Sequence, residues 1–168
     1  MEEKLAKDLV AALRGAGVDF VAYLPETRLS QILPLMRGEQ AVDLVPVASE
    51  AEAVSIGSGA ALGGRQVMVY MEGTGLFVST YNLIVVAKRF GIPLLLGLAY
   101  LGGFSDQRNN TVYSQSGSYL VPLLETLQIR YRVLEDGGNL DGHVRDAVRL
   151  MNSLQLPVAL VFAGEFSG

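Results

Sequence analysis

Hydrophobic and polar positions follow two alternating periods along the chain, and together they predict a regular succession of helices and strands. Apolar residues recur at three- and four-residue spacing in segments that predict helices at residues 5–13, 29–35, 50–62, 75–88, 119–127 and 140–154. Short apolar runs predict strands at residues 18–24, 41–47, 66–71, 92–98, 130–134 and 157–162. Such a succession is typical of an α/β protein, here a three-layer α/β/α arrangement around a six-stranded, mainly parallel sheet.

Three local features refine this prediction. Pro34 is expected to bend or interrupt the second helix. Ser49 resembles an N-cap with Glu52 as its capping-box partner, so the third helix should begin at Glu50 and end before the glycines at positions 63 and 64. Residues 99–118 show neither period, which predicts a long loop that is either functional or disordered.

Composition narrows the class of protein. With 168 residues, half of them hydrophobic, the chain can bury the core of one compact domain spanning residues 1–168. We expect a cytoplasmic protein, because no apolar run approaches the ~18 residues of a membrane span and the chain starts with acidic residues. A net charge of -4 without clustered Lys or Arg argues against nucleic acid or a membrane as partner. The absence of Cys excludes disulfides, thiolate metal sites and a Cys nucleophile.

Polar residues that could carry chemistry follow several of the predicted strands. In an open parallel sheet, ligands bind at the carboxyl ends of the strands. The candidate segments at that edge are residues 25–28, Ser49 with Glu50, residues 72–75 and the long loop that starts at Ala99.

Three common kinds of site are disfavoured. Gly73, Thr74 and Gly75 follow a strand as in a dinucleotide-binding turn, but Val78 stands where the third glycine belongs, and Glu72 would repel a pyrophosphate. His143, the only histidine, is expected at the surface of a polar helix, and no serine elbow accompanies it. Residues 136–139 are interpreted as a turn rather than a magnesium loop, so no metal ligand is predicted in this chain.

Two acids at the start of the third helix need separate explanations. The helix dipole and the capping box account for Glu52 without any function. Glu50 lies between an apolar strand and a helix of small residues with no obvious cation nearby, which suits a buried acid that hydrogen-bonds a ligand nitrogen. Glu50 is therefore the candidate catalytic residue.

Nearly the whole chain resembles the pyrimidine-binding domain of thiamine diphosphate enzymes, and within them the alpha subunits of sulfopyruvate decarboxylase and the related phosphonopyruvate decarboxylases. The resemblance rests on residues 17–21 leading to 24–27, on Ser49-Glu50 and the small-residue helix to Gly63-Gly64, on the turn at residues 73–75, and on residues 91–95. It implies that Glu50 hydrogen-bonds the aminopyrimidine ring and favours its imino tautomer. The cofactor then serves as the electron sink for decarboxylation of a 2-oxo acid.

The same resemblance suggests the remaining contacts. Gly73, Thr74 and Gly75 would line the cofactor site with Glu50. Candidate contacts to the acidic substrate are Thr27, Arg28, Arg108 and Asn109. Further candidates for the same role are Asn110, Tyr113 and Gln115, in a loop that could close over the ligand.

Related enzymes hold the cofactor diphosphate through magnesium at a Gly-Asp-Gly motif, which this chain lacks. The hypothesis is a split enzyme, in which thiamine diphosphate is shared with a beta-type, diphosphate-binding partner chain that holds the magnesium ion. Two alternatives remain open: half of another split thiamine enzyme, such as an acetolactate synthase-like or transketolase-like protein, and a non-catalytic assembly partner. Ala53, Gly57 and Ala60 share one helix face, which would suit a subunit interface or a close neighbour within the chain.

Overall fold

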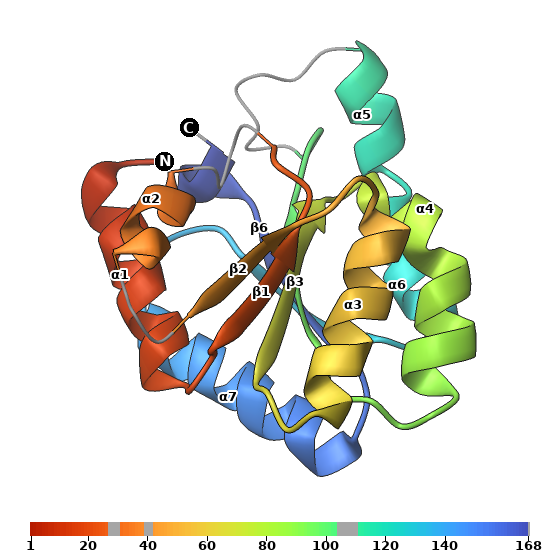
Figure 1. The fold of residues 1–168 in the computed structure, drawn as a ribbon. Helices are drawn as coiled ribbons and strands as arrows, with labels where there is room; N and C mark the ends of the chain where they lie inside the picture. Colours follow the sequence, from red (N-terminus) through yellow and green to blue (C-terminus); the bar gives the residue numbers. More distant parts are fainter. Residues whose placement is uncertain (27–30, 39–41, 104–110, 168) are drawn as a thin grey trace.

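The computed structural model describes residues 1–26, 31–38, 42–103 and 111–167. Six strands form one sheet in the order β2-β1-β3-β4-β6-β5 (Figure 1). All five neighbouring pairs are parallel. The strands are β1 (Phe20–Tyr23), β2 (Asp43–Pro46), β3 (Val67–Glu72), β4 (Leu95–Ala99), β5 (Arg130–Leu134) and β6 (Val158–Phe162).

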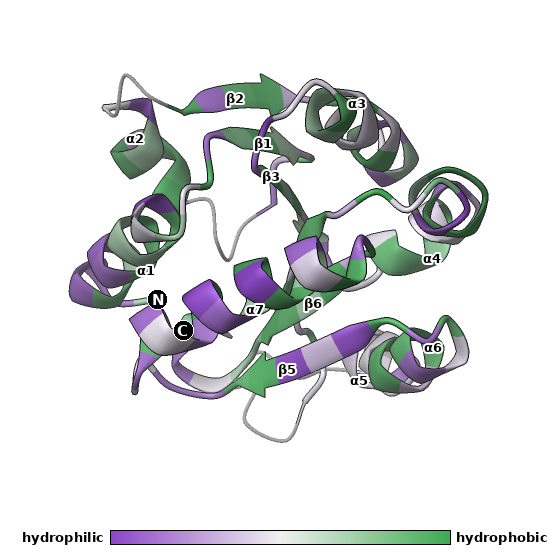
Figure 2. Cartoon of the chain, turned by 90° about the horizontal axis from the view of Figure 1, so that it is seen from below, coloured by the Kyte–Doolittle hydropathy of each residue, from purple (hydrophilic) through white to green (hydrophobic). Residues whose placement is uncertain are grey.

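Helices cover both faces of the sheet, which confirms the predicted α/β fold class. The helices are α1 (Glu3–Gly15), α2 (Ile32–Arg37), α3 (Glu50–Leu62), α4 (Gly75–Asn82), the π-helix η1 (Leu83–Lys88), α5 (Thr111–Gly117), α6 (Leu120–Thr126), α7 (Leu140–Leu154) and the 3₁₀ turn η2 (Gly164–Ser167). One core cluster joins α1, α2 and α7 to the sheet, and a second joins α3, α4, η1 and α6 to the opposite face. Figure 2 shows these two layers on either side of the strands.

The central strands are apolar on both faces because helices cover both sides, as expected for a parallel sheet. Every residue of β4 and β6 is buried, whereas the edge strands β2 and β5 carry exposed residues. Across the part of the chain that the structure describes, the helices are all too short or too polar to cross a membrane.

Three sequence expectations are corrected by the structure. Pro34 does not interrupt α2, because it lies in the first turn, where its backbone needs no N–H donor. The helix predicted over residues 75–88 changes at Leu83 from α to π geometry. The segment 99–118 is not entirely without regular structure, since α5 forms at its end.

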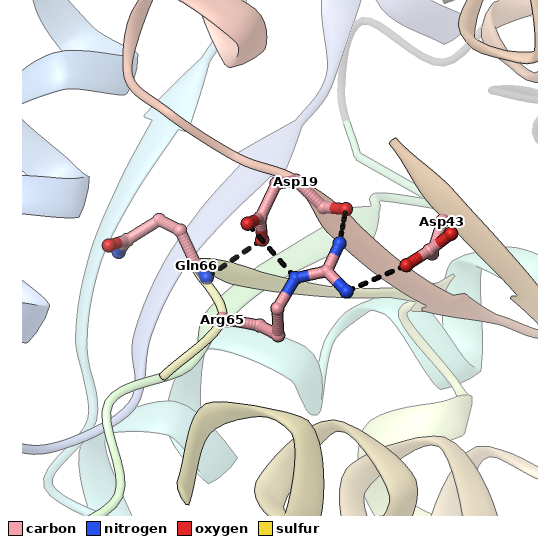
Figure 3. Close-up of polar contacts among 4 residues, drawn as sticks. All are labelled: Asp19, Asp43, Arg65 and Gln66. Carbon is pink, nitrogen blue, oxygen red and sulfur yellow. Dashed lines mark hydrogen bonds and ion pairs between the residues drawn. The ribbon is translucent and has the colours of Figure 1, made fainter. Parts of the chain in front are cut away.

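An ion-pair network ties together the amino ends of three strands. Arg65 precedes β3, and its guanidinium donates to the Asp19 carboxylate at 2.9 Å, to the Asp19 carbonyl at 2.6 Å and to the Asp43 carboxylate at 2.7 Å (Figure 3). Asp19 also accepts from the Gln66 N–H at 2.9 Å. The two carboxylates raise the pKa of Arg65, chiefly through the hydrogen bond to Asp43 and next through that to Asp19. This network fixes β1, β2 and β3 at the edge opposite the candidate site.

Candidate functional site

The candidate site lies at the carboxyl edge of the sheet, where β1 and β3 are neighbours. The chain leaves β1 toward β2 and leaves β3 toward β4, so the strand order reverses between them. Such a reversal point is where open α/β sheets bind ligands. Two of the helices that follow strands at this edge are α3, after β2, and α4, after β3.

Local sequence fixes the start of α3. Ser49 has extended backbone geometry, and its hydroxyl accepts a hydrogen bond from the Glu52 N–H at 3.2 Å. The Glu52 carboxylate accepts from the Ala48 N–H at 2.7 Å, one residue before the Ser49 N–H that a standard capping box would use, so the predicted box forms only in its Ser49 half. Glu50 is therefore the first residue of the helix, held at the edge of the sheet.

The side chain of Glu50 packs against the backbone of Gly75. A Cβ at position 75 would lie 2.4 Å from Glu50 Cγ and 2.8 Å from its Oε1, so that only glycine leaves room for this carboxylate. Two residues predicted from sequence, one on each helix, are thus in direct contact at the edge.

Glu50 is half-buried in the isolated chain, so the expectation of a fully buried acid is wrong for this chain alone. The physical reason is that Glu50 lies in the first turn of a helix at the rim of the sheet, where the described residues cover it only in part. Within the described residues, no hydrogen bond or ion pair engages its carboxylate.

Two other acids at this edge, Glu52 and Glu72, are engaged by local structure. Glu52 accepts the hydrogen bond from the Ala48 N–H, and Glu72 accepts a hydrogen bond from the Thr74 hydroxyl at 2.7 Å. Of Glu50, Glu52 and Glu72, Glu50 is the one whose carboxylate has no hydrogen-bond partner among the described residues.

The turn formed by Gly73 and Thr74 packs closely against neighbouring elements. The Gly73 N–H donates to the Ala99 carbonyl at 2.8 Å. A Cβ at position 73 would lie 3.0 Å from Leu120 Cδ2 and 3.1 Å from the Ala99 oxygen. Gly73 and Thr74 thus support the start of α4, and the Thr74 hydroxyl is directed to Glu72.

Helix α5 packs against the segment that follows β4. A Cβ at Gly117 would lie 1.9 Å from the Leu101 carbonyl oxygen, and one at Gly102 would lie 2.0 Å from the Tyr113 carbonyl oxygen. Gly73, Thr74, Tyr100, Leu101, Ser116, Gly117 and Leu120 line a small hollow between the turn and this helix. The predicted long loop and the glycine turn are therefore adjacent.

Sequence reasoning missed Asn82, which holds the first turn of α3. Its amide nitrogen donates to the Ala51 carbonyl at 3.1 Å and to the Ser55 hydroxyl at 2.7 Å. Ala51 directly follows Glu50, so Asn82 fixes the turn that carries the carboxylate. The sequence did offer a sign of this role. Asn is a poor helix former, and an Asn inside an apolar helix is commonly held there by a hydrogen bond from its side chain.

The structure places the other sequence-selected residues as follows. Thr27, Arg28, Arg108 and Asn109, with Asn110, lie outside the described residues. Tyr113 and Gln115 belong to α5. Asp136 accepts from the Gly138 N–H at 2.7 Å, which confirms a turn before α7. His143 is half-buried and contacts Arg132 far from the site.

The described residues at this edge fit the pyrimidine part of a thiamine cofactor, which carries a ring nitrogen that a carboxyl group can hydrogen-bond. Glu50 offers an uncommitted carboxylate acceptor in a niche that Gly75 keeps open. Within the described ranges, no group of three or more His, Asp or Glu side chains could hold a metal ion.

Comparison with known proteins identifies the family of the chain. Residues 3–100 match the N-terminal TPP binding domain of thiamine pyrophosphate enzymes, and the chain belongs to this family. The match includes both helices that carry the candidate site.

Similar proteins include two that are named sulfopyruvate decarboxylase subunit alpha. The protein from Methanococcus maripaludis is 27% identical over 150 residues, which is 89% of each chain. The protein from Methanocaldococcus jannaschii is 27% identical over 154 residues, 90% of this chain and 88% of the relative.

A solved structure shares the fold at low sequence identity. It is a 2-oxoglutarate:ferredoxin oxidoreductase from Magnetococcus marinus with 2-oxoglutarate, coenzyme A and succinyl-CoA bound. The TM-score is 0.75 at 18% identity, and the match covers 97% of this chain but only 29% of that longer one. This similarity supports the fold class alone.

Proposed function

We propose that the chain is the alpha-type subunit of a split thiamine diphosphate-dependent 2-oxo-acid decarboxylase. The observation that carries the proposal is the uncommitted Glu50 carboxylate, packed against Gly75 at the strand-order reversal of a chain in the thiamine enzyme family. The names of the relatives favour sulfopyruvate as the substrate, with phosphonopyruvate as a close chemical analogue.

In this proposal the chain supplies the pyrimidine-binding half of the site over residues 1–168. When bound, the cofactor supplies the electron sink for loss of carbon dioxide. Glu50 would hold the pyrimidine by a hydrogen bond to its ring nitrogen, in which one proton is shared between the carboxyl group and that nitrogen. Gly75 keeps the niche open for that carboxylate, and Gly73 and Thr74 position the turn beside it.

The diphosphate and magnesium belong to a second chain in the proposed complex. The absence of Gly-Asp-Gly from this sequence supports this division, and the word alpha in the relatives' names supports the existence of a second kind of subunit. Thr27, Arg28, Arg108 and Asn109 remain the candidate contacts to the acidic substrate. A cytoplasmic location also remains a prediction.

The decisive experiment compares Glu50→Gln with Glu52→Gln. The purified chain is mixed with a separately purified chain of similar size that carries Gly-Asp-Gly, together with magnesium and thiamine diphosphate. Carbon dioxide release is measured with sulfopyruvate, phosphonopyruvate and pyruvate. We expect Glu50→Gln to lower the rate at least about 100-fold, because Gln cannot carry the proton.

Glu52→Gln is the matched control, because the Gln side chain can also accept the hydrogen bond from the Ala48 N–H, and it should leave the rate within a few-fold of the original. Full activity of this chain without a partner would contradict the split-site proposal. An unchanged rate with Glu50→Gln would indicate a non-catalytic assembly partner. Products with a new C–C bond would indicate an acetolactate synthase-like enzyme instead.

A further inference from the structure

A groove of about 220 Å³ lies between helix α7 and the edge strand β5. Figure 2 shows β5 as the outermost strand beside α7, with its first part in the purple of hydrophilic residues. Helix α7 packs on β6 and β4, so it covers β5 only in part. The lining of this β5–α7 groove includes Arg130, Arg132, His143, Asp146, Leu150 and Leu160.

Two arginines of β5 face the groove. Alternate residues of a strand lie on the same side, and Leu134 belongs to the core cluster that contains α7, so Arg130 and Arg132 lie on the α7 side as well. Tyr131 and Val133 pack with the cluster on the opposite face of the sheet. Positions two residues apart on a strand are separated by roughly 7 Å. The two guanidinium groups are therefore neighbours at one side of the groove.

The positive charge of these arginines is not neutralised within the described part of the chain. Arg130 and Arg132 form no ion pair there. Asp146 also lines the groove, but its carboxylate pairs with Arg149 at 2.7 Å. The groove therefore keeps an excess of positive charge, although the whole chain carries a net charge of -4.

His143 fixes the direction of one guanidinium group. Nη1 of Arg132 contacts Nδ1 of His143, which belongs to α7. An arginine can only donate, so Nδ1 is the acceptor in this contact. The contact holds the Arg132 side chain toward α7 and leaves its other N–H groups for a further acceptor. A side chain that is already ordered loses less conformational entropy when a ligand binds.

The remaining part of the groove is apolar. Val158 and Leu160 of β6 and Ala147 of α7 are buried residues in the lining. Leu150 is 39% exposed at the same place. An apolar surface beside two guanidinium groups suits a molecule that joins an anionic group to a short hydrocarbon body.

We propose that the β5–α7 groove binds a small organic anion, whose carboxylate, sulfonate or phosphate group pairs with Arg130 and Arg132 and whose carbon body lies on Leu150 and Leu160. Guanidinium groups bind such oxyanions through parallel hydrogen bonds. The groove is smaller than the roughly 300–1,000 Å³ of sites for drug-sized molecules, which limits the ligand to a small one. This site is independent of the proposed decarboxylase function.

An acidic peptide that adds to β5 as a further strand is the alternative occupant. The Leu134 carbonyl accepts from the Ala163 N–H at 2.9 Å, so the backbone groups of alternate residues from Leu134 face β6. Tyr131 and Val133 are then the residues of β5 whose backbone groups face outward. Two residues offer few hydrogen bonds for strand addition, and Arg132 is held toward α7 rather than toward the free edge. These observations favour the small anion.

The test measures binding to the purified full chain by calorimetry and by NMR of backbone amides. The probes are phenyl phosphate, benzenesulfonate and benzoate, which share one apolar body and differ in the anionic group. Inorganic phosphate and phenol each carry only one part of the expected ligand. We expect phenyl phosphate to bind at least about 10-fold more tightly than either of these, and to shift amides of β5 and α7.

The charge in the groove is tested by substitution. Arg130→Gln and Arg132→Gln should each weaken phenyl phosphate binding at least about 10-fold, because each removes a charged donor. Arg145→Gln is the matched control, because Arg145 lies on α7, pairs with Asp141 and is not part of the lining. Asp146→Asn should tighten binding several-fold, because it removes a negative charge from the lining. A variant that fails to fold cannot produce this gain.

Three results would overturn the proposal. Phenyl phosphate could bind no better than phenol or inorganic phosphate, the two arginine variants could bind it as the original chain does, or the shifted amides could lie away from β5 and α7. Binding of a short poly-glutamate peptide to β5 without binding of phenyl phosphate would also overturn it, in favour of strand addition. The measurements need neither a partner chain nor a 2-oxo acid, so their outcome is separate from that of the proposed function.

Discussion

Glu50 packs against Gly75 at the carboxyl edge of the sheet, and the missing side chain of Gly75 leaves the room that the Glu50 side chain occupies. A Cβ at position 75 would lie 2.4 Å from Glu50 Cγ, closer than any non-bonded contact allows. The position of this carboxylate therefore depends on a residue of a different helix.

Gly75→Ala should displace the Glu50 side chain and lower the decarboxylation rate of the assembled complex by roughly 10- to 100-fold, because a misplacement of about 1 Å can cost that much. The chain should remain folded, since the side chain of Glu50 can move outward. Steady-state kinetics and the circular dichroism spectrum would check both statements. Gly15→Ala is the control, because its Cβ would meet only Asp141 Oδ1 at an ordinary 3.7 Å. A Gly75→Ala complex with full activity would show that the position of Glu50 is not critical.

Two glycines of α3 should respond to alanine in opposite ways in the isolated chain. A Cβ at Gly57 would lie 2.8 Å from Val69 Cγ2 and 3.1 Å from Val67 Cγ1, so Gly57→Ala should lower the free energy of unfolding by about 1–3 kcal/mol. Gly59 has open space, and Gly59→Ala should raise it by about 0.5–1 kcal/mol because alanine favours the helix. Urea unfolding measures both. Equal effects would mean that the packing of α3 on β3 is looser than described.

Arg65→Lys should lower the melting temperature by several degrees, although the charge is kept. The guanidinium donates three hydrogen bonds to Asp19 and Asp43 groups in a planar geometry that an ammonium cannot reproduce. Because these carboxylates raise the pKa of Arg65, its stabilising charge is present through the neutral range and would be lost only at strongly alkaline pH. Thermal unfolding at neutral pH is the measurement, with Arg149→Lys as the control in an exposed pair. Equal melting temperatures for the two variants would argue against this network as a clamp.

The sequence predicted those elements whose boundaries or burial depend on residues close together in the chain, such as the start of α3 and the strands. The start of α3 at Glu50 followed from Ser49 and Glu52, whose hydrogen bonds lie within four residues of each other. The strands were recognisable because burial on both faces requires continuous apolar runs. Helix α5 was missed because its sequence, TVYSQSG, has no apolar stripe, and its glycine packs on the backbone of Leu101.

The sequence by itself determined the α/β fold class, the capping of α3 and the selection of Glu50 as the candidate acid, because each depends on residues near one another along the chain. Only the tertiary structure decided that Glu50 meets Gly75, that Asn82 holds the first turn of α3, and that Gly57 points inward while Gly59 points outward. The physical reason is that these contacts join separate helices, whose relative placement is set by the strand order and by packing on the sheet.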